Sequence, residues 1–201
     1  MKTSQGNKKY NLYLAGPIKL WKEEFKPKYS KFFNKKICLF EPGAIDISVN
    51  HKLIPKIISD YDLNEINKSH AILAYIHDYV PNKEGPAGTD SSWECGYAVG
   101  QAKPVIVLVS DLQHLEYYEK QWMVTYNLNA ILTINKEVIK KAKQNEHFSH
   151  LSTLFCKHPR EFESKIIEYL DQYCAIPQIL KTKRIKEIKT VKIKETQKQC
   201  Q

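Results

Sequence analysis

Short apolar runs separated by helix-like stretches restrict the fold of this chain more than any other feature. "AILAYI" (71–76) and "PVIVLVS" (104–110) carry no charged side chain, and similar runs occupy 11–16, 36–43 and 130–134. Successive side chains of a strand point to opposite faces of a sheet. A strand that is apolar throughout must therefore be covered on both faces, which is typical of parallel sheets.

Helical periodicity lies between these runs, at 20–34, 52–69, 91–102, 115–127, 136–147 and 159–174. Strands that alternate with helices predict an α/β fold. With right-handed crossovers, the result is a doubly wound, five-stranded parallel sheet with helices on both faces, flavodoxin-like or Rossmann-like. We expect one α/β domain over residues 1–177, with its ligand site beyond the carboxyl ends of the strands.

The positive charge of the chain is concentrated at its C-terminus. Residues 178–201 hold eight lysine or arginine residues and two glutamates, although the whole chain has a net charge of only +9. We expect this basic tail either to add an edge strand or to stay disordered. Because the body is only mildly basic, we expect no nucleic-acid partner.

The bulk features favour a cytoplasmic protein. No apolar run is long enough to span a membrane, and Pro17 breaks the apolar stretch near the N-terminus that a signal peptide would need. The five cysteines show no CxxC spacing, and no zinc-ligand pattern or phosphate-binding glycine motif is present. The sequence therefore predicts no metal and no cofactor.

Glu94 is the most informative single residue. In "SSWE" (91–94), Ser91 and Glu94 have the spacing of a capping box, which would make Glu94 a structural residue. A carboxylate at a helix N-terminus beyond a strand end can equally be an ionised, positioned nucleophile of the kind that glycosyl transfer requires. The local pattern leaves both interpretations open.

Other polar side chains follow strand ends or accompany Glu94. Asp60 and Asp62 are two residues apart on an expected helix, so one can face inward while the other faces solvent. Asp78 directly follows "AILAYI", and Tyr13 lies at the end of the first strand. The phenol of Tyr13 can donate a hydrogen bond to a carboxylate.

Three segments together carry a resemblance to a known family. "YLAGP" (13–17), "DYDLNEINKSHAILAYI" (60–76) and "WECGYAVGQAKPVIVL" (93–108) resemble segments of the nucleoside 2-deoxyribosyltransferase family, as does "WMVTYN" (122–127). The resemblance covers roughly residues 10–135, and its most specific part is the E-x-G-Y-A-x-x-x-x-K-P core.

The resemblance implies an activity and roles for particular residues. Members cleave the N-glycosidic bond of a 2′-deoxynucleoside and transfer the deoxyribosyl group to another nucleobase. By this resemblance, Glu94 is the nucleophile, Tyr13 donates a hydrogen bond to it, and Asp62 holds the sugar hydroxyls and orients the nucleophile.

The remaining residues would bind substrate. The resemblance matches Asn127 to an asparagine that a neighbouring subunit contributes, which implies a homo-oligomer. The aspartate that handles protons on the base matches Asp90, with Asp78 as the second choice. Gly16 and Asp60 are also expected at the substrate site, and the partners would be deoxynucleosides and free nucleobases.

Two alternatives remain open. The first is a hydrolase of 2′-deoxynucleoside 5′-monophosphates that uses the same nucleophile with water as acceptor. Such enzymes seat the phosphate in a loop with serine and arginine, whereas "GPIKLW" (16–21) has neither. The second is a non-enzymatic module that binds nucleotides or nucleic acid through the basic tail.

Overall fold

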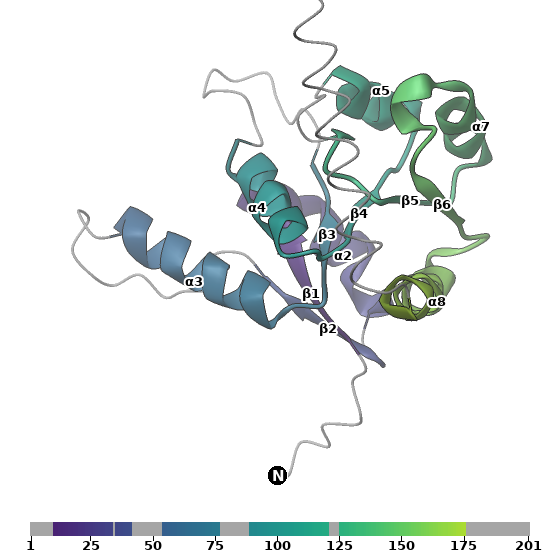
Figure 1. Cartoon of the computed structure of the whole chain (residues 1–201). Coiled ribbons are helices and arrows are strands. Elements are labelled where there is room, and N and C mark those ends of the chain that lie inside the picture. The colour runs from purple at the N-terminus through teal and green to yellow at the C-terminus, as the bar shows by residue number, and fades with distance from the viewer. Residues whose placement is uncertain (1–9, 34, 42–53, 77–88, 121–124, 176–201) are drawn as a thin grey trace, which may run out of the picture.

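The fold is a doubly wound parallel sheet, as the apolar runs predict (Figure 1). The computed structural model describes residues 10–33, 35–41, 54–76, 89–120 and 125–175. Within these ranges, six parallel strands lie in the order β2-β1-β3-β4-β5-β6. Their bounds are β1 (Tyr10–Ala15), β2 (Ile37–Phe40), β3 (Ala71–Ala74), β4 (Val105–Leu108), β5 (Ala130–Thr133) and β6 (Ser152–Phe155).

The predicted number of strands was wrong by one. β6 pairs with β5 and forms an edge of the sheet. Its sequence "STLF" is only half apolar, and its side chains are exposed or half-buried, unlike the fully buried β3, β4 and β5. An edge strand that is incompletely covered lacks the continuous apolar run on which the sequence prediction depended.

Helices cover both faces of the sheet (Figure 1). Ile66, Cys95, Leu115 and Val138 pack on one face. They come respectively from α3 (Ile54–Lys68), α4 (Thr89–Gly100), α5 (Leu112–Lys120) and α7 (Lys136–Gln144). The segment 18–33 and α8 (Phe162–Ala175) cover the other face. Short 3₁₀ turns, η3 (Glu146–Phe148) and η4 (Pro159–Glu161), join the later elements. The helix expected at 115–127 begins earlier, at Leu112.

The connection after β1 is not the continuous helix that its periodicity suggests. It consists of α1 (Ile18–Leu20), a π-helical turn η1 (Trp21–Phe25), α2 (Lys26–Lys28) and a 3₁₀ turn η2 (Ser30–Phe32). The backbone N–H of Lys26 donates to the carbonyl of Trp21, five residues earlier. Pro27 has no N–H to continue the α-helical ladder, which accounts for the irregular geometry here.

A buried carboxylate fastens α8 to the start of β2. One oxygen of Glu163 accepts the backbone N–H groups of Lys35, Lys36 and Ile37, at 3.0, 2.7 and 2.8 Å. Replacing Glu163 with glutamine removes the charge from these three bonds. We expect a loss of about 2–3 kcal/mol of unfolding free energy, measured by urea denaturation.

Glu168→Gln is the matched control for this prediction. Glu168 lies on the same helix and is exposed, where it pairs with Lys165. We expect the control to change stability by less than about 1 kcal/mol, because exposed ion pairs contribute little. Equal effects of the two substitutions would contradict the structural role assigned to Glu163.

Parts of the sequence prediction fall outside the described residues. These include the basic tail 178–201, so its expected edge strand or disorder stays a prediction, and the segment around Asp78. No helix in the described part of the chain has the length and apolar character needed to cross a bilayer.

Candidate active site

A buried carboxylate–phenol pair joins α4 to β1. The hydroxyl of Tyr13 donates a hydrogen bond to Oε1 of Glu94 over 2.6 Å, across 81 residues of sequence. Tyr13 is fully buried and Glu94 is 6 % exposed. Tyr13 lies on β1 and is in register with Phe40 of β2 and Ile72 of β3. The Tyr13–Glu94 pair is therefore anchored where β1 is flanked by β2 and β3.

Asp62 contributes to the same site from α3. Its side chain is 8 % exposed. Burial raises the pKa of the Tyr13 phenol, the charge and hydrogen bond of Glu94 raise it further, and Asp62 adds to the increase. The phenol therefore stays protonated and acts as a hydrogen-bond donor to a carboxylate. Glu94, Tyr13 and Asp62, which the sequence predicted to converge, are brought together.

The capping-box interpretation of Ser91 and Glu94, one of the two that the local pattern left open, does not fit the observed start of α4. α4 begins at Thr89, so Ser91 is already the third residue of the helix and Glu94 the sixth. The run "TDSS" (89–92) holds four residues that favour helix starts, and the sequence could not distinguish among them. The effect of the helix dipole fades beyond the first turn, so the dipole stabilises the ionised Glu94 carboxylate less than a capping position would. The hydrogen bond from the Tyr13 hydroxyl is the interaction that holds this carboxylate in position.

Cys95 can be set aside as a nucleophile. Its side chain is fully buried in the layer between α4 and the sheet. Burial raises the pKa of the thiol, and the charge of Glu94 raises it further. The thiolate is the nucleophilic form of cysteine, so this side chain is unreactive at neutral pH.

The other predicted site residues have different positions. Asp60 is exposed on α3, so it faces away from the side of the helix that buries Asp62, as the spacing predicted. The backbone of Asp90 lies in the first turn of α4, and Asp78 lies outside the described residues. Gly16 directly follows β1 with φ of 156°, where a Cβ would be 2.4 Å from the carbonyl oxygen of Tyr75.

Asn127 lies close to α4 of its own chain. A Cβ on Gly96 would be 3.7 Å from the Nδ2 of Asn127, whose side chain is half-buried. Gly96 is two residues after Glu94 on the same helix. The position of Asn127 beside the helix that carries the candidate nucleophile is thus an observation, and its role across a subunit interface stays a prediction.

Part of the E-x-G-Y-A-x-x-x-x-K-P pattern is structural. The ammonium group of Lys103 donates to the carbonyls of Ile66 and Asn67 over 2.6 and 2.7 Å, at the C-terminal end of α3. The hydroxyl of Tyr97 donates to the side chain of Asn67. These bonds fix α3 against α4 and so set Asp62 and Glu94 in position.

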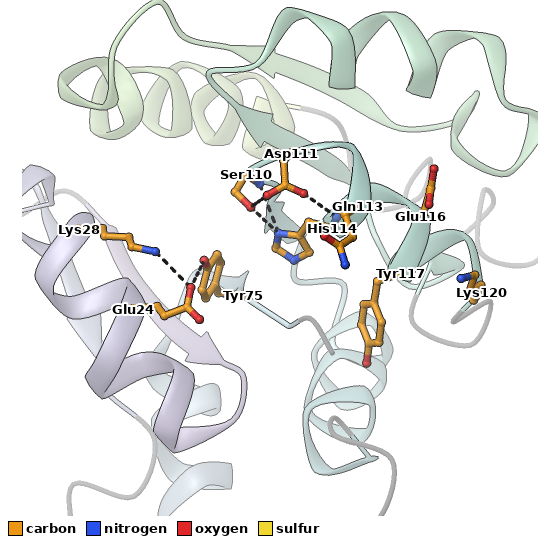
Figure 2. A pocket seen from close by; sticks show the side chains of 10 residues that line it. All are labelled: Glu24, Lys28, Tyr75, Ser110, Asp111, Gln113, His114, Glu116, Tyr117 and Lys120. Carbon is orange, nitrogen blue, oxygen red and sulfur yellow. Dashed lines mark hydrogen bonds and ion pairs between the residues drawn. The ribbon is translucent and has the colours of Figure 1, made fainter. Parts of the chain in front are cut away.

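Sequence reasoning missed a polar hollow at the carboxyl edge of the sheet. It has a volume of about 470 Å³ and lies between η1–α2 and α5 (Figure 2). Glu24, Tyr75, Asp111 and His114 line it. The sequence held one relevant signal, in "SDLQH" (110–114). Asp111 directly follows the apolar run 104–110, and an aspartate at the start of a helix is typical of an N-cap.

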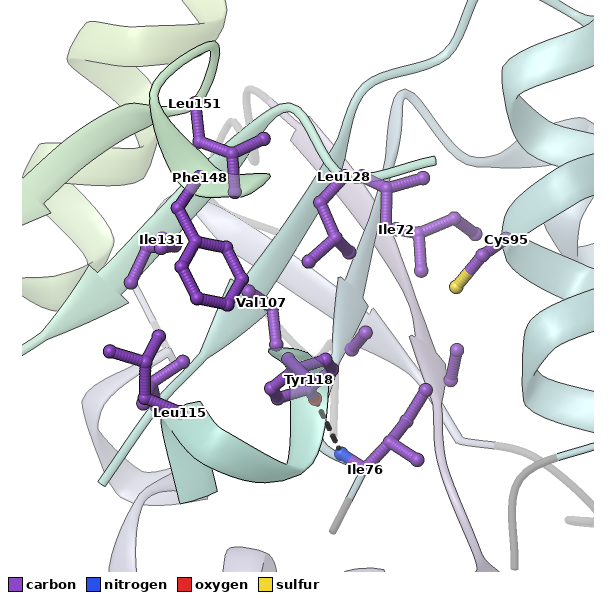
Figure 3. Packing of buried hydrophobic residues seen from close by; sticks show 14 of the residues in the cluster. Ile72, Ile76, Cys95, Val107, Leu115, Tyr118, Leu128, Ile131, Phe148 and Leu151 are labelled. Carbon is purple, nitrogen blue, oxygen red and sulfur yellow. Dashed lines mark hydrogen bonds between the residues drawn. The ribbon is translucent and has the colours of Figure 1, made fainter. Parts of the chain in front are cut away.

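Helix α5 holds the end of β3 beside this hollow. The backbone N–H of Ile76 donates to the hydroxyl of Tyr118 over 3.0 Å (Figure 3), and the carbonyl of Ile76 lies 2.8 Å from Nε2 of His114. Because a carbonyl only accepts, Nε2 of His114 carries the proton. Both backbone groups of Ile76 are therefore satisfied by α5 side chains.

Comparisons with known proteins give distant similarities only. No protein-family model and no curated protein sequence matches the chain. Similar solved structures include a 2-deoxyribosyltransferase from Bacillus psychrosaccharolyticus, with 14 % identity, 71 % of this chain and 97 % of that chain covered, and a TM-score of 0.39. A conserved protein from Enterococcus faecalis V583 has 18 % identity, 81 % and 98 % coverage, and a TM-score of 0.41. Similarities with TM-scores below 0.5 do not support a functional assignment. Any assignment must therefore depend on the site residues of this chain.

Proposed function

We propose that this protein is a nucleoside 2-deoxyribosyltransferase. The enzyme would cleave the N-glycosidic bond of a 2′-deoxynucleoside and pass the deoxyribosyl group to a second nucleobase. The observation that carries the proposal is the 2.6 Å bond between Tyr13 and the buried carboxylate of Glu94, with Asp62 alongside. Such a held carboxylate suits a glycosyl-transfer nucleophile, as in retaining glycosidases.

The reaction would proceed by double displacement. An oxygen of Glu94 bonds to C1′ while the bond from C1′ to the base nitrogen breaks, and the base departs with that electron pair. A second base then attacks C1′ and releases the carboxylate, so the configuration is retained. A 2′-hydroxyl would withdraw electrons from the oxocarbenium-like transition state, which favours 2′-deoxy substrates.

The other residues have supporting roles in this proposal. Tyr13 would hold the carboxylate in place by donating its hydrogen bond, and Asp62 would accept a hydrogen bond from the sugar hydroxyl. The departing base needs a proton at a ring nitrogen, which Asp90 or Asp78 would supply. Asn127 would act across a subunit interface of a homo-oligomer. No metal or other cofactor takes part in these steps.

Incubation with deoxyinosine and free adenine tests the proposal. Formation of deoxyadenosine together with hypoxanthine supports transfer. Hypoxanthine without deoxyadenosine would instead support a hydrolase, and the absence of both products would contradict a glycosyl-transferring function with these substrates. A module that only binds nucleic acid would lose salt-sensitive binding when residues 178–201 are deleted, without any dependence on Glu94.

Tyr13→Phe should reduce kcat while leaving the fold intact. The substitution removes the hydroxyl that orients Glu94, and we expect a loss of about tenfold to a hundredfold in kcat. It also removes one donor from a buried carboxylate, which should lower the unfolding free energy by about 1–3 kcal/mol. Steady-state kinetics and urea denaturation measure the two effects.

Tyr10→Phe is the matched control. The hydroxyl of Tyr10, on the same strand, donates to the carboxylate of Asp171 on α8, and its ring packs in the opposite layer. Removal of this second phenol–carboxylate bond should leave kcat unchanged. If Tyr10→Phe and Tyr13→Phe lowered kcat equally, the Tyr13 hydroxyl would have no specific role at the site.

A further inference from the structure

A single lysine joins the two helices that carry the buried carboxylates of the candidate site. The backbone N–H of Lys103 donates to the carbonyl of Ala98 over 3.0 Å, near the end of α4. Its ammonium group donates to the carbonyls of Ile66 and Asn67 over 2.6 and 2.7 Å, near the end of α3. Lys103 therefore bonds α4 through its main chain and α3 through its side chain, where the two helices lie side by side (Figure 1).

Both helices are held one turn after a carboxylate of the site. Ile66 is four residues after Asp62 on α3, and Ala98 is four residues after Glu94 on α4. Residues four apart lie on the same face of a helix, separated by about 6 Å along its axis. The bonds of Lys103 thus hold each helix at the turn that follows its buried carboxylate.

The backbone that directs Lys103 toward α3 is unusual. Ala102 has a φ of 58°, and it is the only residue other than glycine with a positive φ in the part of the chain that the structure describes. The N–H of Ala102 donates to the carbonyl of Val99 over 2.9 Å, which together with the Lys103–Ala98 bond forms a Schellman cap of α4. A left-handed residue with a Cβ is unfavourable, so neighbouring bonds must hold this turn in place.

The separation of the two carboxylates matters because both act on one phenol. Burial raises the pKa of the Tyr13 phenol, and Glu94 and Asp62 both raise it further. The 2.6 Å bond between Tyr13 and Glu94 joins β1 to α4 and does not include α3. A shift of α3 relative to α4 should therefore displace Asp62 while the Tyr13–Glu94 pair stays formed.

We propose that Lys103 is a positioning residue, which holds Asp62 at the distance from Glu94 that a bound deoxyribosyl group requires. This inference rests on the proposed function, in which Asp62 would accept a hydrogen bond from the sugar hydroxyl. Lys103 touches neither the substrate nor the reacting atoms in this account. Its effect on the reaction should therefore depend on the carboxylate that it positions.

A double-mutant cycle tests this dependence. Lys103→Met removes the ammonium group and keeps an unbranched side chain, and Asp62→Asn removes the charge that Lys103 is proposed to position. We expect Lys103→Met to lower kcat/KM for deoxyinosine about tenfold in the otherwise unmodified protein, but less than about threefold in the Asp62→Asn protein. A general loss of stability would lower kcat/KM by the same factor in both backgrounds.

The substrate provides a second readout of positioning. The loss caused by Asp62→Asn should be smaller for an analogue that lacks the hydroxyl held by Asp62, because that contact is already absent. Comparison of deoxyinosine with 2′,3′-dideoxyinosine and 2′,5′-dideoxyinosine identifies this hydroxyl. We expect the effect of Lys103→Met to shrink with the same analogue, whereas a purely structural role would affect all three substrates equally.

Lys68→Met is the matched control. Lys68 lies at the same end of α3, and its ammonium group is exposed and pairs with Glu65 over 2.8 Å. Because exposed ion pairs contribute little, this substitution should change kcat/KM by less than about twofold in both backgrounds.

Asn67→Ala is a second variant that should fold even if Lys103→Met does not. Asn67 is exposed, and its side-chain oxygen accepts from the Tyr97 hydroxyl over 3.1 Å and from Gln101 over 2.7 Å. Alanine favours the helix, so the substitution weakens the contact between α3 and α4 without disrupting α3. We expect a smaller loss of kcat/KM than with Lys103→Met, again reduced in the Asp62→Asn background.

Two measurements examine the contact without turnover. In hydrogen exchange followed by mass spectrometry, α3 peptides should exchange about tenfold faster in the Lys103→Met protein and no faster in the Lys68→Met protein. Calorimetric titration of deoxyinosine into Glu94→Ala protein measures binding. There too, we expect Lys103→Met to weaken binding less when Asp62 is already asparagine.

The outcomes distinguish this inference from the proposed function. Transfer activity in which the effects of Lys103→Met and Asp62→Asn simply multiply would overturn the role of Lys103 and leave the transferase intact. Exchange of α3 that Lys68→Met accelerates as much as Lys103→Met would do the same. Coupled effects on binding in a protein that transfers no deoxyribose would support the role of Lys103 and contradict the transferase. Absence of both binding and transfer would overturn both.

Discussion

Replacing Glu94 with alanine is expected to abolish deoxyribosyl transfer while the protein stays folded. The substitution removes the only group proposed to bond with C1′, so kcat should fall by about 10³-fold or more. The fold should persist, because the sheet and the α3–α4 bonds of Lys103 do not depend on this carboxylate. Transfer from deoxyinosine to adenine measures activity, and circular dichroism with urea denaturation measures folding.

Glu65→Gln is the control for the Glu94→Ala experiment, because it also removes a buried carboxylate. Glu65 is 9 % exposed on α3, where its carboxylate accepts from Lys68 over 2.8 Å. The substitution should leave kcat near that of the unmodified protein. If Glu94→Ala transferred deoxyribose at a near-native rate, Glu94 could not be the nucleophile.

Gly16→Ala should disturb both stability and activity. The φ of 156° is unfavourable for a residue with a side chain, and the new Cβ would lie 2.4 Å from the carbonyl oxygen of Tyr75. Either β1 or the end of β3 must move, at a cost of about 2–4 kcal/mol of unfolding free energy. Because Tyr13 lies on the same strand, we also expect kcat to fall.

Gly100→Ala is the corresponding control for a glycine substitution. Gly100 is the last residue of α4, and nothing lies within 4 Å of the position that its Cβ would occupy. Alanine favours the helix over glycine, so this protein should be unchanged or more stable by up to about 1 kcal/mol. A Gly16→Ala protein as stable as the Gly100→Ala protein would show that the end of β1 tolerates a side chain.

The sequence sufficed for the fold class because buried parallel strands leave a strong signal. β3, β4 and β5 are fully buried, and their apolar runs were recognisable without any structure. β6 was missed because an edge strand need not be apolar on both faces. The π-helical turn Trp21–Phe25 was also missed, since periodicity does not distinguish α-helical from π-helical spacing over five residues.

The candidate site was predictable only in part. The spacing of Asp60 and Asp62 predicted that the two side chains face different sides of the helix, and the family resemblance selected Asp62 as the inward one. Asp62 is buried and Asp60 is exposed, and Tyr13 donates a hydrogen bond to Glu94. The sequence could not fix the first residue of α4, so it overestimated the contribution of the helix dipole to Glu94. It also gave no indication that Glu24 and Asp111, 87 residues apart in the chain, face one hollow.

Intact-mass spectrometry after mixing the protein with deoxyinosine, without an acceptor base, tests the central claim most directly. We predict a covalent adduct of one deoxyribosyl group, mapped by peptide analysis to Glu94 and lost on addition of adenine as deoxyadenosine forms. The Glu94→Ala protein should form no adduct. An adduct on a different residue, or transfer activity without any adduct after rapid quenching, would contradict Glu94 as the covalent nucleophile.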